Sequence, residues 1–269
     1  TLRDFADTDD NENWALKEFK ASETQLIDAE ELKDAKNAMG ENKYEQEFEI
    51  SFEAPIVGAF YGELLKELTD KNRIREIIPE AATQKVTAWD LGMSDSTAIW
   101  VAEIISGEIR VMDFYEANGE SLDHYIKWLD EKGYRDYTHI MPHDVNVREL
   151  QTGKSRYQFL TEAGLEIEVA PKASVEDGIQ AVRRILPNCW FNKDKTRAGV
   201  ECLQNYRRVF NEKTSSFQNR PLHDWSSHAA DAFRYLALGM DSAGNGQRTD
   251  WSKPFETTVD GDSYKDYYV

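Results

Sequence analysis

The sequence predicts an α/β fold with a mixed sheet flanked by helices, and three observations lead to that prediction. Hydrophobic residues make up 40% of the 269 residues and aromatic residues 12%, enough for a large buried core. Three apolar runs separated by short turns, at 85–91, 96–105 and 108–117, are typical of consecutive strands. Amphipathic helical patterns then alternate with short apolar runs as far as residue 240. This alternation favours an α/β domain.

The predicted elements of residues 84–240 follow one another closely. Ser106-Gly107 is a tight turn between two apolar runs, so the first three strands should form an antiparallel meander. Gly164 can end a helix, and Ser174 can cap the next one. The later strands are predicted at 138–144, 165–172 and 189–192. The helices, each with one apolar face, are predicted at 121–132, 155–164, 174–186, 195–211 and 225–239.

The first 83 residues mix helical patterns with one alternating run. Residues 28–39 read as a helix capped by Asp28 and ended by Gly40. Apolar and polar residues alternate over 44–52, which predicts a strand, and residues 59–70 again read as a helix. The final segment, 241–269, is rich in Gly, Ser and Asp and is expected to be a tail.

Composition excludes several classes of protein. No apolar run approaches the roughly 20 residues of a membrane-spanning helix, and the acidic start lacks the pattern of a signal peptide. Two cysteines are too few for a disulfide-built scaffold, so a reducing compartment is expected. The net charge of -18 argues against nucleic acid as a partner. However, residues 148–220 hold 13 basic and 9 acidic residues, so a local basic stretch is present.

Two of the predicted strands end in a carboxylate. Asp90 closes the run 85–91, and Gly92 after it permits a tight turn and close backbone approach. Asp144 closes the run 138–144. Buried strands rarely contain aspartate, and ligands of open α/β folds bind at strand ends. Each aspartate alone is equally consistent with an ordinary turn.

A third carboxylate lies in a predicted helix. His228, Asp231 and Tyr235 recur at i, i+3 and i+7, so they share one helix face. The alanines around Asp231 allow close packing on a sheet, where a carboxylate needs a partner or a cation. His228 is also consistent with a structural histidine in the first turn of the helix.

Together the three carboxylates predict a site for divalent cations. Converging carboxylates repel one another, and a cation relieves that repulsion. Oxygen ligands suit Mg²⁺ or Mn²⁺, and two such ions roughly 3.5–4 Å apart can activate water and stabilise the leaving oxygen of a phosphodiester. Residues 152–155, TGKS, match the end of a nucleotide-binding loop, but Arg148 stands where its first glycine is required. No ATP site is therefore predicted.

Three segments, TAWDLGMSDSTAIW, HDVN and PLHDWSSHAADAFRYLALG, resemble the nuclease domain of the large terminase subunit of tailed bacteriophages. The segment from CWFN to GVECLQNYRRVFNEK is also similar, and KYEQEFEISFEAPIVGAFYGELL resembles the end of the family's ATPase domain and its linker. The resemblance covers roughly residues 40–240 and implies an RNase H-like fold. It implies an ATPase-domain end and linker at 1–83, a nuclease domain at 84–240 and a C-terminal tail at 241–269.

The resemblance also implies an activity and its residues. The expected activity is metal-dependent endonucleolytic cutting of concatemeric phage DNA during genome packaging. Residue by residue, the match makes Asp90, Asp144 and Asp231 the catalytic and metal-binding carboxylates, holding two ions of Mg²⁺ or Mn²⁺. The supporting residues are Gly92, Asp95, Asp224 and His228, of which Asp95 and Asp224 are the alternatives to Asp144.

Partners follow from the same resemblance. Double-stranded DNA is the expected substrate, and the portal protein and small terminase subunit are the expected partners, with no membrane involved. ATP would be used only by an ATPase domain, which the motifs of this chain do not supply. The expected location is the host cytoplasm, transiently at the procapsid portal. The candidate DNA contacts in the basic stretch are Arg148, Lys154, Arg156, Arg197, Arg207 and Arg220, about half of which are expected to be solvated helix charges.

Two other interpretations are consistent with the carboxylates. One is another enzyme of the same fold class, such as a junction resolvase, a transposase or a sugar-kinase-like phosphotransferase. A phosphotransferase would need a second glycine-rich phosphate loop, which the sequence lacks. The other is an acidic binding protein without catalysis, which would bind no metal at the carboxylates.

Overall fold

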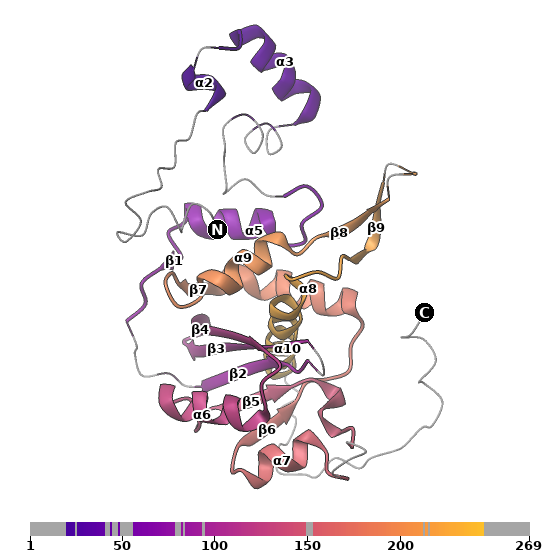
Figure 1. Ribbon diagram of the computed structural model, residues 1–269. Helices are drawn as coiled ribbons and strands as arrows, with labels where there is room; N and C mark the ends of the chain where they lie inside the picture. Colours follow the sequence, from indigo (N-terminus) through magenta and orange to yellow (C-terminus); the bar gives the residue numbers. More distant parts are fainter. Residues whose placement is uncertain are drawn as a thin grey trace, which may run out of the picture.

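Figure 1 shows the protein as a computed structural model. The structure describes residues 20–24, 26–40, 44, 48, 56–78, 82, 84–92, 95–148, 153–211, 213–214 and 216–244. The helices are α2 (Ala21–Thr24), α3 (Ala29–Met39), α5 (Gly62–Asp70), α6 (Leu122–Lys132), α7 (Arg156–Glu162), α8 (Val175–Ile185), α9 (Arg197–Asn205) and α10 (Ser227–Gly244). The strands are β1 (Ile74–Arg75), β2 (Gln84–Asp90), β3 (Ser96–Ile105), β4 (Glu108–Asn118), β5 (Thr138–Met141), β6 (Glu166–Val169), β7 (Cys189–Asn192), β8 (Arg208–Asn211) and β9 (Ser216–Pro221). The 3₁₀ helices are η1 (His143–Asn146) and η2 (Leu186–Asn188).

A mixed sheet lies at the centre of the fold, in the strand order β1-β7-β4-β3-β2-β5-β6. β2, β3 and β4 form the predicted antiparallel meander. The pairs β2–β5, β5–β6, β4–β7 and β1–β7 are parallel. Because β2 and β5 are parallel neighbours, their carboxyl ends lie at the same edge of the sheet. Across the meander, Asp90 is opposite Ala98, which in turn is opposite Glu116.

Helices cover both faces of this sheet (Figure 1). Residues of β2 alternate between the faces: Val86 and Ala88 pack with α5, α8, α9 and α10, whereas Trp89 packs with α6 and α7. α10 lies at the middle of the first face, where Phe233 is fully buried. The predicted fold class, a mixed sheet flanked by helices, is confirmed.

Residues 56–75 pack into the same core as the rest. Phe60, Tyr61 and the apolar face of α5 are buried with α8, α9 and α10, and β1 pairs with β7 at the edge of the sheet. The sequence did not predict β1, which is only two residues long. The assignment of residues 1–83 to an ATPase-domain end and linker stays a prediction. At the other boundary, α10 continues to Gly244, and the rest of the predicted tail lies outside the described residues.

The helix predicted over 28–39 is confirmed as α3. Asp28 caps it by accepting a hydrogen bond from the backbone of Glu30, and Gly40 follows its last residue with a φ of 83°. The strand predicted over 44–52 is wrong at Tyr44 and Phe48, which are helical; the other residues of that run lie outside the described ones. Their rings stack at 5.2 Å, which is the i, i+4 contact of a helix.

Two other predicted elements end earlier than expected. The strand at 138–144 stops at Met141, because Pro142 cannot donate to a neighbouring strand, and Asp144 lies in η1 instead. The helix at 195–211 stops at Asn205, and β8 pairs with β9 in a hairpin that was not predicted from the sequence. The backbone of Arg208 donates to Gly58 and not to the preceding helical turn, so a distant segment ends the helix.

None of the helices in the described ranges is long and apolar enough to cross a membrane.

Candidate active site

Asp90 lies at the carboxyl end of β2, where the sequence predicted it. Its Oδ2 accepts a hydrogen bond from Nδ1 of His228, in the first turn of α10, at 3.1 Å. The side chain of Asp90 is 19% exposed. Burial raises the pKa of Asp90 to about 6, against the hydrogen bond from His228, and the nearby charge of Asp231 adds to the rise. That hydrogen bond in turn raises the pKa of His228, against burial.

Asp231 lies one turn along α10 from His228 and faces the same site. Its Oδ1 accepts hydrogen bonds from Nε of Arg234 at 3.1 Å and from the hydroxyl of Tyr206 at 3.5 Å. Nη2 of Arg234 is 2.7 Å from the same oxygen. The predicted pairing of His228 and Asp231 on one helix face is therefore what the structure shows, and this face meets the end of β2.

Asp144 lies beyond the end of β5, in η1, and its side chain is exposed. Its link to the other carboxylates is electrostatic and runs through Tyr235 of α10. Burial raises the pKa of Tyr235, and the charges of Asp90, Asp231 and Asp144 all add to the rise. Asp90 and Asp144 thus follow two parallel neighbouring strands at one edge of the sheet, and Tyr235 lies on the helix that carries Asp231.

The three aspartates share this edge without forming a closed cage. Among the described residues, no three His, Cys, Asp or Glu side chains are grouped so that they could hold one metal ion. Asp90 contacts His228, and Asp231 forms an ion pair with Arg234. The donor set itself, carboxylate oxygens at a strand end with mutual repulsion, fits a hard divalent cation.

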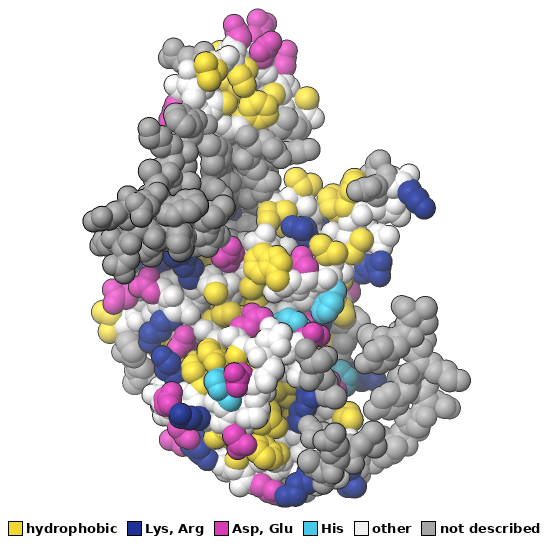
Figure 2. Space-filling model, in the orientation of Figure 1, with side chains coloured by type: hydrophobic (Ala, Val, Ile, Leu, Met, Phe, Trp, Pro, Cys, Tyr) yellow, Lys and Arg dark blue, Asp and Glu magenta, His cyan; other side chains and the backbone are white. Residues whose placement is uncertain are grey.

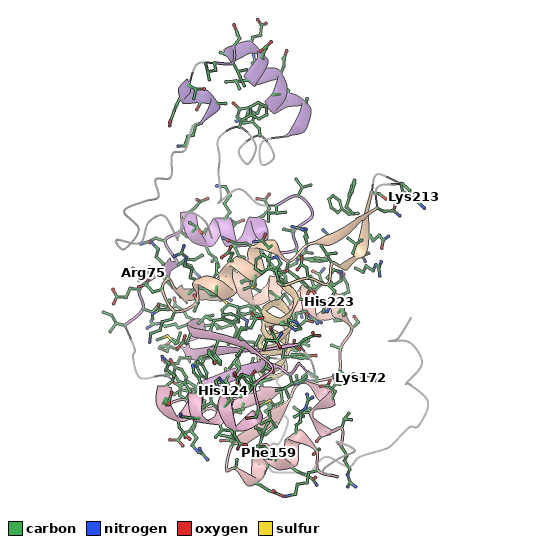
Figure 3. All side chains as sticks on the ribbon, in the orientation of Figure 1. Arg75, His124, Phe159, Lys172, Lys213 and His223 are labelled. Carbon is green, nitrogen blue, oxygen red and sulfur yellow. The ribbon has the colours of Figure 1, made fainter. Side chains whose placement is uncertain are left out.

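Histidines and acidic side chains gather on the face drawn in Figure 2, and hydrophobic and basic side chains of the β8–β9 hairpin lie above them. The ring of His223 lies 5.9 Å from that of His228, edge to face. Figure 3 labels His223 beside the start of α10, and Lys213 at the tip of the hairpin. Trp225, two residues after His223, is 55% exposed.

The supporting residues have distinct structural roles. A Cβ at Gly92 would lie 2.6 Å from the backbone oxygens of Asp95 and Ser96, so the turn after β2 requires glycine, as predicted. Asp95 is exposed on that turn. Asp224 accepts hydrogen bonds from the backbone and hydroxyl of Ser226 and so organises the turn before α10.

Among the candidate DNA contacts, Arg156 is held beside the carboxylates. Its Nη1 donates to the backbone oxygen of Leu91 at 3.3 Å, one residue after Asp90. Lys154 instead pairs with Glu162 at 2.6 Å. Arg148 lies on the turn after η1, and Arg197 lies at the start of α9. Arg207 lies at the base of the hairpin, and Arg220 lies on β9.

Two residues of this site, Arg234 and Tyr206, were not predicted from the sequence. Arg234 could have been found, because a charged residue in the apolar run of a buried helix needs a partner, and Asp231 is three residues away. No local pattern points to Tyr206, which reaches Asp231 from the chain after α9.

Comparisons with known proteins agree with this fold. No family model matches the chain. The large terminase subunit of Escherichia phage T5 is 22% identical over 236 residues, which are 83% of this chain and 51% of that protein. The chain thus spans about half the length of this curated relative.

The solved structures that are similar to the chain include large terminases as well. The large terminase of a thermophilic bacteriophage matches with a TM-score of 0.53 and 15% identity, over 86% of this chain and 57% of that one. The nuclease domain of the large terminase from bacteriophage SPP1, solved with bound Mn, has a TM-score of 0.44 and 17% identity, over 62% of this chain and 96% of that one. By sequence the chain is similar to the large terminase subunit of a bacteriophage, and the solved large terminase with the TM-score of 0.53 shares its α/β fold.

Proposed function

We propose that the chain is a metal-dependent DNA endonuclease of a viral packaging terminase, which cuts concatemeric double-stranded phage DNA. The observation that carries the proposal is the meeting of Asp90 and Asp231, from β2 and α10, at the edge that also holds Asp144. The buried carboxyl of Asp90 has its pKa raised by burial and by the charge of Asp231. Like charges brought together at a strand end are typical of a site that binds a cation.

Asp90, Asp144 and Asp231 would hold the Mg²⁺ or Mn²⁺ ions, and we propose two of them. Bound there, such ions supply an activated water and neutralise charge on the phosphodiester. Of the protein's own residues, His228 orients one of these ligands, because its Nδ1 donates a hydrogen bond to one oxygen of Asp90. Gly92 keeps the turn after β2 close to the backbone of β3.

DNA would reach this edge along the basic side chains around it. Arg156, fixed on the backbone beside Asp90, is best placed to contact a phosphate next to the reacting one. Arg148, Lys154, Arg197, Arg207 and Arg220 are proposed as further phosphate contacts. With a net charge of -18, the protein can hold DNA only through such a local field, so cutting by the chain alone should be weak and produce heterogeneous ends.

The wider biological role rests on the terminase similarity. Because the chain spans about half of its curated relative, the packaging role is proposed for the whole protein. Its partners would be the portal protein and the small terminase subunit, ATP would be used by an ATPase domain, and the location would be the host cytoplasm.

Cleavage of supercoiled plasmid in Mn²⁺ or Mg²⁺ tests the proposal. The parent chain should nick and linearise plasmid, and Asp90→Asn should not, because the amide keeps the shape of the carboxylate but removes its charge. Asp136→Asn is the matched control, since it removes an exposed carboxylate from the turn before β5 and should leave cleavage intact.

Three outcomes would contradict the proposal. Cleavage retained in Asp90→Asn would exclude that residue, and cleavage in excess chelator would exclude metal dependence. A strong preference for four-way junctions over linear duplex would favour a junction resolvase instead.

A further inference from the structure

Arg234 is a buried charge paired with a carboxylate. It lies in the apolar part of α10, between Phe233 and Leu236, and is 7% exposed. A guanidinium in such a place is costly unless it is paired, and it forms an ion pair with Asp231. The mechanism proposed above needs Asp231 as a ligand but does not require a buried arginine beside it.

The contacts of Arg234 are made to a single oxygen of that ligand. Nε and Nη2 lie 3.1 and 2.7 Å from Oδ1 of Asp231, and the hydroxyl of Tyr206 donates to the same atom at 3.5 Å. Among the described residues, no side chain donates a hydrogen bond to Oδ2 of Asp231. The side chain of Asp231 remains 28% exposed.

The neighbouring elements are shaped to hold the guanidinium in place. On α8, a Cβ at Gly178 would lie 3.1 Å from Cδ and 3.3 Å from Nη1 of Arg234, so a larger residue at this position would press on the arginine. The rings of Tyr61 and Tyr206 stack at 5.8 Å. Burial raises the pKa of the Tyr61 hydroxyl; the charge of Asp231 adds to the rise and that of Arg234 opposes it.

We propose that Arg234 is a positioning residue for Asp231. Two nitrogens of its planar guanidinium bind Oδ1 and so fix the rotation of the carboxylate. The other oxygen, Oδ2, is thereby presented to the divalent cation. The inference rests on the proposed function, because it concerns how one ligand of that site is aimed. An ordinary structural ion pair would stabilise the fold but would leave metal affinity and turnover unchanged once the protein is folded.

The substitution Arg234→Lys separates geometry from charge. Lysine keeps the positive charge, but its ammonium is a point donor that cannot donate from two fixed atoms, so Asp231 should rotate more freely. The matched control is Arg183→Lys on α8. The guanidinium of Arg183 is also partly buried and donates twice to one oxygen, but that oxygen is the backbone oxygen of Phe60 and not a carboxylate.

Two measurements on the full chain test the proposal. Electron paramagnetic resonance, without DNA, follows free Mn²⁺ during titration and gives the Kd at the site. Plasmid cleavage gives kcat and KM. For Arg234→Lys we expect the Mn²⁺ Kd to rise and kcat to fall, each about tenfold or more, with KM for DNA nearly unchanged. Arg183→Lys should change neither by more than about twofold.

The outcomes distinguish this inference from the proposed function. If Arg234→Lys is folded and binds Mn²⁺ and turns over like the parent, the positioning role is overturned and the endonuclease stands. Equal losses in Arg183→Lys would also overturn it, because they would show a general packing effect. If the parent chain binds Mn²⁺ no more tightly than Asp90→Asn does, both proposals fail.

A second variant covers the case in which Arg234→Lys does not fold. Tyr206→Phe keeps the buried ring and removes only the hydroxyl that donates to Oδ1 of Asp231. Its Mn²⁺ Kd should rise by about threefold, less than for the arginine because the contact is longer. An unchanged Kd in this folded variant would count against fixation of the carboxylate through Oδ1.

Discussion

His139 on β5 should make the stability of the protein fall steeply in acid. It is fully buried, and its ring is part of a hydrogen-bonded chain between β2 and β5. Nε1 of Trp89 donates to Oγ1 of Thr87 at 2.7 Å, Oγ1 in turn donates to Nδ1 of His139 at 2.7 Å, and Nε2 of His139 donates to the backbone oxygen of Arg135 at 3.1 Å. In the neutral state each of these polar atoms has a partner, whereas a proton on Nδ1 would take away the acceptor of the Thr87 hydroxyl proton.

The size of the effect follows from the pKa. Burial lowers the pKa of His139 from 6.5 to about 4, so between these pH values the unfolded chain binds a proton that the folded one does not. The stabilisation is present above pH 6.5 and is lost as the pH falls through that range. At 1.36 kcal/mol per pH unit, the loss is about 3 kcal/mol.

Urea unfolding at pH 7 and pH 4, compared between the parent and His139→Gln, measures this loss. Glutamine can accept and donate a hydrogen bond without titrating, so the variant should be less stable at pH 7 but lose about 3 kcal/mol less on acidification. Other groups titrate alike in both proteins, so their contributions to the acid loss cancel. One of them is Glu168: burial raises its pKa to about 7, so its protonation stabilises the fold as the pH falls. Equal acid losses in the two proteins would refute the argument.

Three further outcomes are expected. Gly199→Ala should destabilise the fold by about 1–3 kcal/mol in thermal unfolding, because its Cβ would lie 2.3 Å from the ring of Trp100; the usual gain from alanine in a helix would show that the space is open. Asp90→Asn should raise the melting temperature at pH 7.5 in chelator, since it removes a charge that burial disfavours; a lower value would contradict this. Arg156→Ala should lower the salt slope of duplex binding by about 1, and an unchanged slope would exclude a phosphate contact.

The meander and the central carboxylates could be predicted from the sequence because their signals are local. β2, β3 and β4 are joined by short turns, and their apolar runs are long enough to be recognised without knowing the partner strand. Asp90 stood out as a carboxylate ending an apolar strand, and Asp231 as one on a helix face with His228. That these two lie together is shown by the structure; their roles as ligands stay a prediction.

What the sequence did not show depends on contacts between distant residues. β1 has two residues, and its partner β7 is more than a hundred residues away, so no local pattern marks it. The helix ends at Asn205 because the chain after it binds to the segment around Gly58, which propensity does not record. The strand prediction at Tyr44 and Phe48 was wrong because alternating residues and an i, i+4 aromatic pair are both present in the same run.

The place of α10 in the chain has a consequence for synthesis on the ribosome. The strands of the central sheet all emerge earlier, but one face of that sheet stays open until Ala229, Phe233 and Leu236 arrive to fill it. The same helix carries His228 and Asp231, so a nascent chain that stops before it has Asp90 without the residues that meet it at the strand end. Folding of the core and assembly of the acidic site are therefore completed by one late segment, and a chain that lacks this segment has neither.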